Sequence, residues 1–404
     1  MSYEIFNMSE STLPFNWRLL SLKDLSIEMF GGGTPSTKRA EFWEGDQPWT
    51  TSAMIGNDDI YLKKYQRLIT REALDNSSTK VVPKGSIIIG TRVGVGKAVV
   101  TLINIAINQD LTAFIPTDEV SPEFLVLSIK QKSIQQWFNN NKRGATIKGI
   151  PRNDLANIRL FIPPLPEQKA IAHILQAVQE AKEKTEEVIR VTKQLKESIM
   201  KHLFTYGPVP PGEAEKVKLK ETEIGIMPEE WEVKPLIEIA TLQRGKDLPR
   251  QKQISGIYPV VGSGGIIGWH NEYICKGPGV VTGRSGSIGS LTFIEREYWP
   301  HNTGLYVKDF HKNDPKFIFY LLHLLNFKKY ATGVSVPTLN RNFIHHILLP
   351  LPSLSIQKKI ASIFSALKAK IEAEENKKKS LEDLFKTLLN DLMTARIRVK
   401  NLEV

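Results

Sequence analysis

Two glycine-rich stretches hold the residues whose types and spacing best suit chemistry on a phosphate. They read GTRVGVGKA at 90–98 and GRSGSIGS at 283–290. The first lacks the glycine spacing of a nucleotide-binding phosphate loop, and Ala98 stands where that loop needs a serine or threonine for magnesium. The second lacks the strand–helix–strand unit of a dinucleotide site. We interpret both as turns between strands that present polar side chains.

Such turns suit DNA, because backbone amides and small side chains can approach phosphates while arginine can pair with guanine in the major groove. The alternative for each turn is a plain hairpin with no ligand. Further loop cations lie near the start of each globular part, in FGGGTPSTKRAEFW (30–43) and LQRGKDLPRQK (242–252), where we expect Trp43 and the nearby Trp49 to be core residues. The candidate DNA contacts are Lys38, Arg39, Arg92, Lys97, Arg143, Lys148, Arg244, Lys246, Arg250, Arg284, Ser285 and Ser287.

The residues of a catalytic or metal centre are missing from the sequence. The eight histidines form no ligand set, and the adjacent His345 and His346 would face opposite sides of a strand. The single cysteine, Cys275, excludes a disulfide framework and zinc motifs that need paired cysteines. The sequence has no serine-nucleophile elbow and no amino-methyltransferase signature. We therefore expect no catalytic residue, no metal and no cofactor in this chain.

Charge points to a polyanionic partner. The 404 residues include 54 Lys and Arg against 43 Asp and Glu, a net charge of +11, which suits a phosphate backbone. The alternative is that lysine-rich solvated helices make the chain basic. The longest apolar run, FIFYLLHLL at 317–325, is too short to span a bilayer, and the acidic start MSYEIFNMSE has no apolar signal core. We expect a cytoplasmic protein with no membrane contact.

One segment occurs twice. RNDLANIRLFIPPLPEQKAIAHIL begins at Arg152, and RNFIHHILLPLPSLSIQKKIASIF begins at Arg341, 189 residues later. Each copy leads into a long stretch free of Pro and Gly, the first from about 167 to 204, with apolar residues at seven-residue spacing. Each helix could cover its own domain, but 38 residues span about 57 Å, more than such a domain is wide. We predict that the two helices pack on each other.

The globular parts also match each other. LPFNWRLLSLKDLS from Leu13 corresponds to MPEEWEVKPLIEIA from Met227, and in both parts a strand–turn–strand block precedes a helix opened by proline, after Ser121 and after Asp314. The Pro-rich and charged stretch 207–226 is typical of a linker. The predicted fold class is α+β, with two globular domains of mixed β-sheet and helices, two long coiled-coil helices and a pseudo-two-fold internal repeat.

The chain resembles the DNA specificity subunit of type I restriction–modification enzymes over essentially its whole length. The motifs that carry the resemblance are FGGGTPSTKRAEFWEGDQPWTT, PKGSIIIGTRVGVGKAVV, the IPPLPEQKAIA junction and the repetition of the whole unit. It implies two target recognition domains separated by an antiparallel helix pair. The implied boundaries are 1–165 and 227–353 for the recognition domains, 166–206 and 354–404 for the helices, and 207–226 for the linker.

The resemblance also implies partners. These are double-stranded DNA, two methyltransferase (modification) subunits bound on the helices, and restriction subunits for cleavage. Each half of an asymmetric bipartite target would hold an adenine methylated at N6 with S-adenosylmethionine, which the methyltransferase carries. The candidate partner contacts lie at the junctions, where the two copies differ at Glu167 and Ile356: they are Glu167, Gln168, Gln357 and Lys358. The alternatives are a free-standing DNA-binding scaffold without a methyltransferase, and an enzyme with its own active site.

Overall fold

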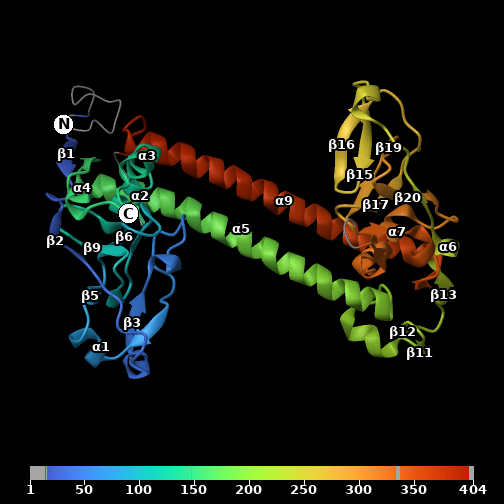
Figure 1. The fold of residues 1–404 in the computed structure, drawn as a ribbon, viewed down its shortest axis with the longest axis horizontal. Coiled ribbons are helices and arrows are strands. Elements are labelled where there is room, and N and C mark those ends of the chain that lie inside the picture. The colour runs from blue at the N-terminus through green and yellow to red at the C-terminus, as the bar shows by residue number, and fades with distance from the viewer. Residues whose placement is uncertain (1–13, 15, 147, 334–336, 400–404) are drawn as a thin grey trace. The chain divides into compact units, whose positions relative to one another are not determined.

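The computed structural model describes residues 14, 16–146, 148–333 and 337–399. The acidic start of the chain and residues 400–404 therefore lie outside the described part. The chain forms two compact units. The first unit contains residues 1–186 and 376–404, and the second contains 187–375. Each unit thus includes one globular part together with a portion of both long helices (Figure 1).

The first unit holds two four-stranded sheets, of order β2-β9-β6-β7 and β4-β3-β8-β5, and the pair β1-β10. All four residues of β6, which read IIIG, are buried, as expected for a central strand covered on both faces. The strands are β1 Arg18–Ser21, β2 Ser26–Gly31, β3 Gln47–Thr50, β4 Arg67–Ile69, β5 Lys80–Val82, β6 Ile87–Gly90, β7 Ala98–Val100, β8 Ile105–Ile107, β9 Leu111–Pro116 and β10 Arg159–Ile162. The short helices are α1 Arg71–Asp75, α2 Pro122–Ile129, α3 Lys132–Asn141 and α4 Arg152–Ala156.

The second unit repeats this plan with a four-stranded sheet of order β14-β20-β17-β18, a three-stranded sheet β16-β15-β19 and the pair β13-β23. Its strands are β13 Glu232–Pro235, β14 Thr241–Arg244, β15 Tyr258–Gly262, β16 Gly265–His270, β17 Gly279–Gly283, β18 Leu291–Ile294, β19 Trp299–Pro300, β20 Gly304–Asp309, β21 Ala331–Thr332, β22 Thr338–Leu339 and β23 Leu348–Leu351. Its short helices are α6 Leu236–Ile239, α7 Pro315–Leu322 and α8 Arg341–Ile344.

The repeats seen in the sequence correspond to the same elements in both units. The duplicated junction forms β10 and β23, and each pairs antiparallel with the strand that follows the matched tryptophan, β1 or β13. The predicted proline-opened helices are α2 and α7. Their N-caps are Ser121 and Asp314, whose side chains accept hydrogen bonds from the backbone N–H three residues on. The first predicted helix is divided, because α3 starts separately at Lys132.

The two long helices are α5, Leu165–Tyr206, and α9, Leu354–Met393. In the first unit Glu186 pairs with Lys378 at 3.0 Å, and in the second Lys193 pairs with Glu375 at 2.7 Å. A higher residue number in α5 thus pairs with a lower residue number in α9, so the helices are antiparallel. Each half of α5 packs with part of α9 in a core of its own unit, which confirms the predicted helix pair.

Both helices end where the backbone turns left-handed. Gly207 follows α5 with φ of +79°, the conformation that favours glycine at a helix end. Ala395, with φ of +56°, lies just beyond α9. The second helix was expected to continue to 404, but it ends at Met393, and Ala395 and Val399 pack against the core of the first unit.

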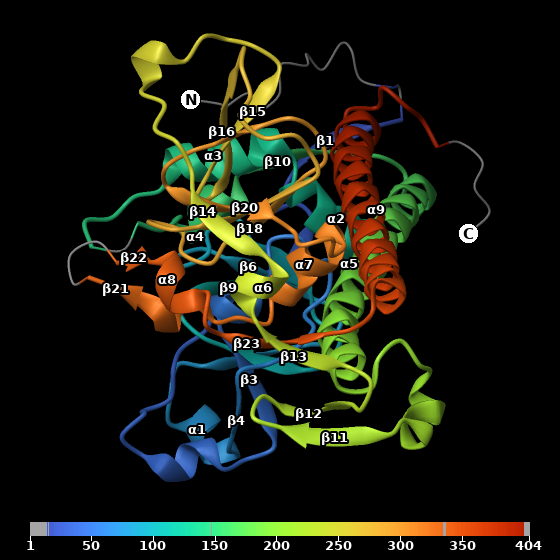
Figure 2. The ribbon, with the colours of Figure 1, turned by 90° about the vertical axis from the view of Figure 1, so that its right-hand side faces the viewer.

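The stretch 207–226 is more ordered than a linker. It contains a short 3-10 helix, Pro211–Lys216, and then a hairpin of β11, Leu219–Thr222, and β12, Gly225–Pro228. Met227 is buried in the core of the second unit. Figure 2 shows this hairpin at the opposite end of the second unit from β15 and β16. The charged composition of the stretch concealed a hairpin that is anchored by the buried Met227 and Pro228 at the end of β12.

Candidate nucleic-acid interface

The two glycine-rich turns have the same backbone structure. In the first unit the Gly90 N–H donates to the Lys97 carbonyl at 2.8 Å, and in the second the Gly283 N–H donates to the Ser290 carbonyl at 2.8 Å. A second bond inside each turn, from Gly96 to Gly90 and from Gly289 to Gly283, is also repeated. Each turn joins two antiparallel strands, β6 to β7 and β17 to β18, as predicted.

The first glycine of each turn is needed for space. A Cβ atom on Gly90 would lie 2.2 Å from the Gly94 carbonyl oxygen, and one on Gly283 would lie 1.9 Å from the Ser287 carbonyl oxygen. Real Cβ atoms essentially never come so close to backbone, so a side chain at either position would open the turn. The glycine therefore determines the shape of each turn, and the other residues of the turn determine which groups it presents to a ligand.

A later loop of each unit is hydrogen-bonded to its turn. The Ile150 N–H donates to the Thr91 carbonyl at 2.7 Å, and the Leu339 N–H donates to the Arg284 carbonyl at 2.8 Å. In the first unit this places the loop of Arg143 and Lys148 beside Arg92, because Arg143 and Gly149 pair and Gly149 packs against Arg92. These three cations are exposed, and two of them also lie near a carboxylate, Arg143 at 3.2 Å from Asp154 and Arg92 at 4.0 Å from Asp110. The structure thus brings together three of the predicted DNA contacts from two separate segments.

The second unit has a corresponding group. Arg284 and Ser285 are half-buried and Ser287 is exposed, while the exposed Arg244 is close enough to act on Arg284 electrostatically. Burial, and to a smaller extent the charge of Arg244, lowers the pKa of the Arg284 guanidinium. Two adjacent guanidinium groups repel each other, so an anion placed between them is stabilised.

The remaining predicted cations differ in how free they are. Lys38, Lys246 and Arg250 are exposed. Arg39 is exposed too, but it makes ion pairs with Glu41 and Glu72, each at 2.7 Å, and its guanidinium lies 3.9 Å from the Phe42 ring centroid. The structure therefore gives the Arg39 side chain internal partners. Trp49 is buried, with its indole N–H donating to the Gly33 carbonyl, as expected of a core residue.

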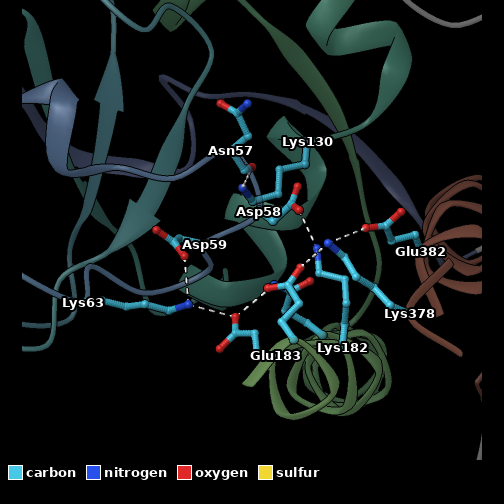
Figure 3. Close-up of polar contacts among 11 residues, drawn as sticks. Asn57, Asp58, Asp59, Lys63, Lys130, Lys182, Glu183, Lys378 and Glu382 are labelled. Carbon is cyan, nitrogen blue, oxygen red and sulfur yellow. Dashed lines mark hydrogen bonds and ion pairs between the residues drawn. The ribbon is translucent and has the colours of Figure 1, made fainter. Parts of the chain in front are cut away.

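Lys97 also has an internal role, because its ammonium donates to the Ile55 carbonyl at 2.8 Å. It is half-buried, so the turn presents Arg92 outward and keeps Lys97 for the loop 55–59. Two more lysines hold the same loop. Lys130 donates to the Asn57 carbonyl at 2.6 Å, and the almost fully buried Lys182 of α5 pairs with Asp58 (Figure 3).

This lysine cluster extends to both long helices within the first unit. Lys63 bridges Asp59 and Glu183, each at 2.9 Å, and Lys378 of α9 lies 3.7 Å from Glu382 (Figure 3). Between the glycine turn and these helices lies a cavity of about 560 Å³. Its lining includes Gly94–Lys97, Lys130, Lys182 and Phe385. The cluster connects the turn to the helix pair, and we infer that it fixes the orientation of the turn.

Burial determines the titration of the cluster. It lowers the pKa of Lys130 from 10.5 to about 8, although Asp58 and Asp59 oppose the shift. The hydrogen bond from Lys182 holds the pKa of Asp58 below its usual range. Apart from Lys97 in the glycine-rich turn, no sequence pattern indicated this cluster, because its other members come from separate segments outside the motifs.

The junction residues expected to bind a partner are mostly engaged within the chain. Gln168 is buried, and its amide accepts from the Ser121 N–H at 2.8 Å and donates to the Glu119 and Pro163 carbonyls. Gln357 is its counterpart, which accepts from the Asp314 N–H at 2.9 Å and donates to Asn313 and Pro352. Each glutamine thus ties the start of a long helix to the N-cap of α2 or α7.

Glu167 is likewise buried. Its carboxylate accepts from the Trp17 indole N–H at 3.2 Å and from Arg398 at 2.7 and 2.9 Å. The structure therefore gives Glu167, Gln168 and Gln357 positioning roles inside their units, and their contact with a partner stays a prediction. Lys358 is exposed, and its contact with a partner stays a prediction.

His345 ends α8 and does not stand on a strand as the sequence suggested. Its Nε2 accepts from the Leu242 N–H at 3.0 Å, and burial lowers its pKa. Within the described ranges no group of three His, Cys, Asp or Glu side chains could hold a metal ion. Among the same residues no helix combines the length and the apolar character needed to cross a membrane.

Comparison with known proteins decides the family. The type I restriction modification DNA specificity domain matches residues 14–193 and again residues 228–383, which is most of the chain and both halves of the repeat. The chain belongs to this family. It is a DNA specificity subunit of a type I restriction–modification system, a non-catalytic part of that enzyme.

Individual relatives agree. The chain is 27% identical to the specificity subunit of the type I restriction enzyme MjaVIII from Methanocaldococcus jannaschii, over 96% of this chain and 95% of that protein. It is also 27% identical to the MjaIX specificity subunit of the same organism, over 59% of this chain and 55% of that protein. The crystal structure of an S subunit from M. genitalium has the same fold, with a TM-score of 0.65 at 18% identity, covering 96% of this chain and 98% of that one.

Proposed function

We propose that the first and second units of this specificity subunit each read one half of an asymmetric bipartite target in double-stranded DNA. The carrying observation is that the two glycine turns share one backbone structure but present different side chains. In the first turn the backbone N–H groups of Thr91 and Arg92 both donate to the Asp110 carbonyl. In the second turn those of Arg284 and Ser285 both donate to the Thr303 carbonyl, so the two pairs of residues occupy corresponding positions. A shared turn backbone with different side chains in the two units suits the recognition of two different half-sites.

Charge supports the same proposal. Arg92, Arg143 and Lys148 lie around the first turn, and Arg244, Lys246 and Arg284 lie around the second. The exposed cations of these groups can release counterions from phosphates, while an arginine beside a small residue can reach a guanine edge. We therefore assign phosphate contacts to the flanking lysines and base contacts to Arg92 and Arg284.

The partners form part of the proposal. Two methyltransferase subunits would dock on the helix pair and transfer methyl groups from S-adenosylmethionine, which they would bind, to one adenine in each half-site. Restriction subunits would join through them, in the cytoplasm. The junctions differ, with buried Glu167 in the first and half-buried Ile356 in the second, so the two docking contacts would differ in detail.

The experiment that tests this is co-expression of the chain with its candidate methyltransferase, followed by mapping of methylated adenines by single-molecule sequencing. A split motif with two different halves and a fixed gap is expected. Gly90→Ala should abolish recognition of one half and Gly283→Ala recognition of the other, because each added Cβ would open one turn. Gly212→Ala, where a Cβ meets open space, is the matched control.

The competing function is a free-standing DNA-binding scaffold, which needs no methyltransferase. It predicts tight sequence-specific binding by the purified chain alone, and no complex on co-expression. A stable complex that methylates both halves with either glycine variant would count against the assignment of one turn to each half-site.

A further inference from the structure

The hairpin of β15 and β16 exposes an unusual amount of apolar surface. β16 is the edge strand of its sheet, and Ile266, Ile267 and Trp269 along it are 54%, 56% and 46% exposed. A β-bulge leaves Ile267 without a partner between the pairs Val261–Ile266 and Val260–Gly268, and both isoleucines are exposed near the hairpin tip. An exposed apolar edge is a liability that proteins normally cover, which indicates a ligand surface.

The tip of this hairpin lies against the second glycine turn. A Cβ on Gly283 would lie 2.7 Å from the Ser263 carbonyl oxygen, and one on Gly264 would lie 3.5 Å from the Ser287 hydroxyl. The Ser263 N–H also donates to the Thr303 hydroxyl at 3.2 Å, and the Thr303 carbonyl accepts from the turn. The apolar tip is therefore continuous with the proposed DNA contact of this unit.

One flank of the hairpin is basic. The segment 250–254 runs beside β16, held by a bond from the Gln253 amide to the Trp269 carbonyl at 3.1 Å and one from the Asn271 N–H to the Ile254 carbonyl at 3.1 Å. This segment carries the exposed Arg250 and Lys252. A basic segment beside an apolar ribbon complements a duplex, whose phosphates lie outside its bases.

The described residues of the first unit show no such exposed apolar edge at the corresponding strand. The strand that corresponds to β16 in the first unit is β4. Each is the edge strand of its sheet and pairs antiparallel with a neighbour, β3 or β15, which in turn pairs parallel with one further strand. Along β4, Arg67 is exposed, Leu68 is half-buried and Ile69 is fully buried. Within the part of the chain that the structure describes, the apolar ribbon is found in the second unit and not at the matching strand of the first, so its contribution should appear in one half-site only.

We propose that the β15–β16 ribbon enters the major groove of the DNA and that Ile266 and Ile267 contact thymine methyl groups in the half-site read by the second unit. The inference rests on the proposed function. The major groove admits a two-stranded β-ribbon, and the thymine methyl is the apolar group that the base pairs present there. Isoleucine offers no hydrogen bond, so it selects thymine over bases that show only polar edges.

The test uses the complex of the chain with its methyltransferase and duplexes in which each thymine of the mapped target is replaced in turn by uracil, which removes only the methyl group. At a contacted position uracil should weaken binding by about 4-fold, the effect of exposing one methyl-sized group. The double variant Ile266→Ala/Ile267→Ala should bind the thymine duplex about 10-fold more weakly and should not distinguish uracil from thymine. Ile27→Ala, at a 70% exposed isoleucine of the first unit, is the matched control and should behave like the parent.

The outcomes are distinct. If the complex has a defined target but no position in either half responds to uracil, the ribbon inference is wrong while the proposed function stands. If the double variant no longer binds the methyltransferase in sedimentation velocity, the apolar edge docks a protein and the inference is also overturned. If the parent complex recognises no DNA target at all, the proposed function itself fails. Thermal unfolding of the double variant confirms that the fold is kept.

Discussion

Neutralising Glu167 should release the C-terminal segment from the first unit. The carboxylate is 7% exposed and receives two bonds from Arg398 and one from Trp17. Arg398 also donates to the Asn16 side chain at 3.0 Å. In Glu167→Gln the new amide N–H₂ would face one N–H donor of Arg398, so at least one charge-assisted bond is lost and a largely buried guanidinium is left half-satisfied.

The cost follows from these contacts. A hydrogen bond to a charged group contributes about 1.5–3 kcal/mol, and stranding a buried charge costs about 3–5 kcal/mol. Because the Arg398 side chain is 21% exposed and water can partly replace the lost partner, we expect about 2–3 kcal/mol. Local opening of residues 394–399 should then become roughly 30- to 150-fold more frequent.

Hydrogen exchange measures this opening directly. The Ile397 N–H donates to the Asp391 carbonyl at 3.1 Å, so its protection reports whether the segment is docked. The control is Glu187→Gln, which removes an exposed ion pair with Arg190 and should leave Ile397 exchange unchanged. The pair Glu167→Gln/Arg398→Met should cost less than the sum of its single changes, because no charge is stranded. Parental exchange at Ile397 in Glu167→Gln would refute the idea that this carboxylate holds the segment.

The other predictions concern the glutamines, the lysine cluster and the helices. Gln168→Leu and Gln357→Leu should each destabilise their own unit by about 3 kcal/mol, because each loses three hydrogen bonds of about 1 kcal/mol. Urea unfolding measures the loss, and limited proteolysis shows which unit has been destabilised. An equal loss of stability in both units would contradict the local role of each glutamine. The pKa of Lys130 is about 8 in the folded protein against 10.5 in the unfolded chain, so the folded protein binds this proton more weakly. The stability of the parent relative to Lys130→Met should therefore rise with pH between these two values and stay constant below them. If circular-dichroism melts show no change in this stability difference across that window, the pKa is not depressed. Inserting one heptad into both α5 and α9 should widen the gap between methylated half-sites and leave each half unchanged, whereas an unchanged gap would show that helix length does not set it.

The sequence by itself determined the parts of this protein that depend on local rules. An uninterrupted run of helix formers bounded by proline and glycine gave α5 within two residues at each end, and serine or aspartate before proline marked the N-caps of α2 and α7. Glycine spacing revealed both turns, because a turn that leaves no room for a Cβ needs glycine in any fold. The segment repeated 189 residues later predicted two matching units, since similar patterns of apolar residues bury the same faces of their helices and strands.

Only the tertiary structure decided which charged side chains are free. Lys97 and Arg92 lie five residues apart in one turn, yet Lys97 reaches the Ile55 carbonyl while Arg92 stays exposed with Asp110 4.0 Å away. The junction residues Glu167 and Gln168 resembled surface contacts until Trp17, Arg398 and Ser121 were placed beside them. A local pattern records what the backbone needs at each position. The partners of these side chains come from segments between 42 and 231 residues away, and only packing brings them together.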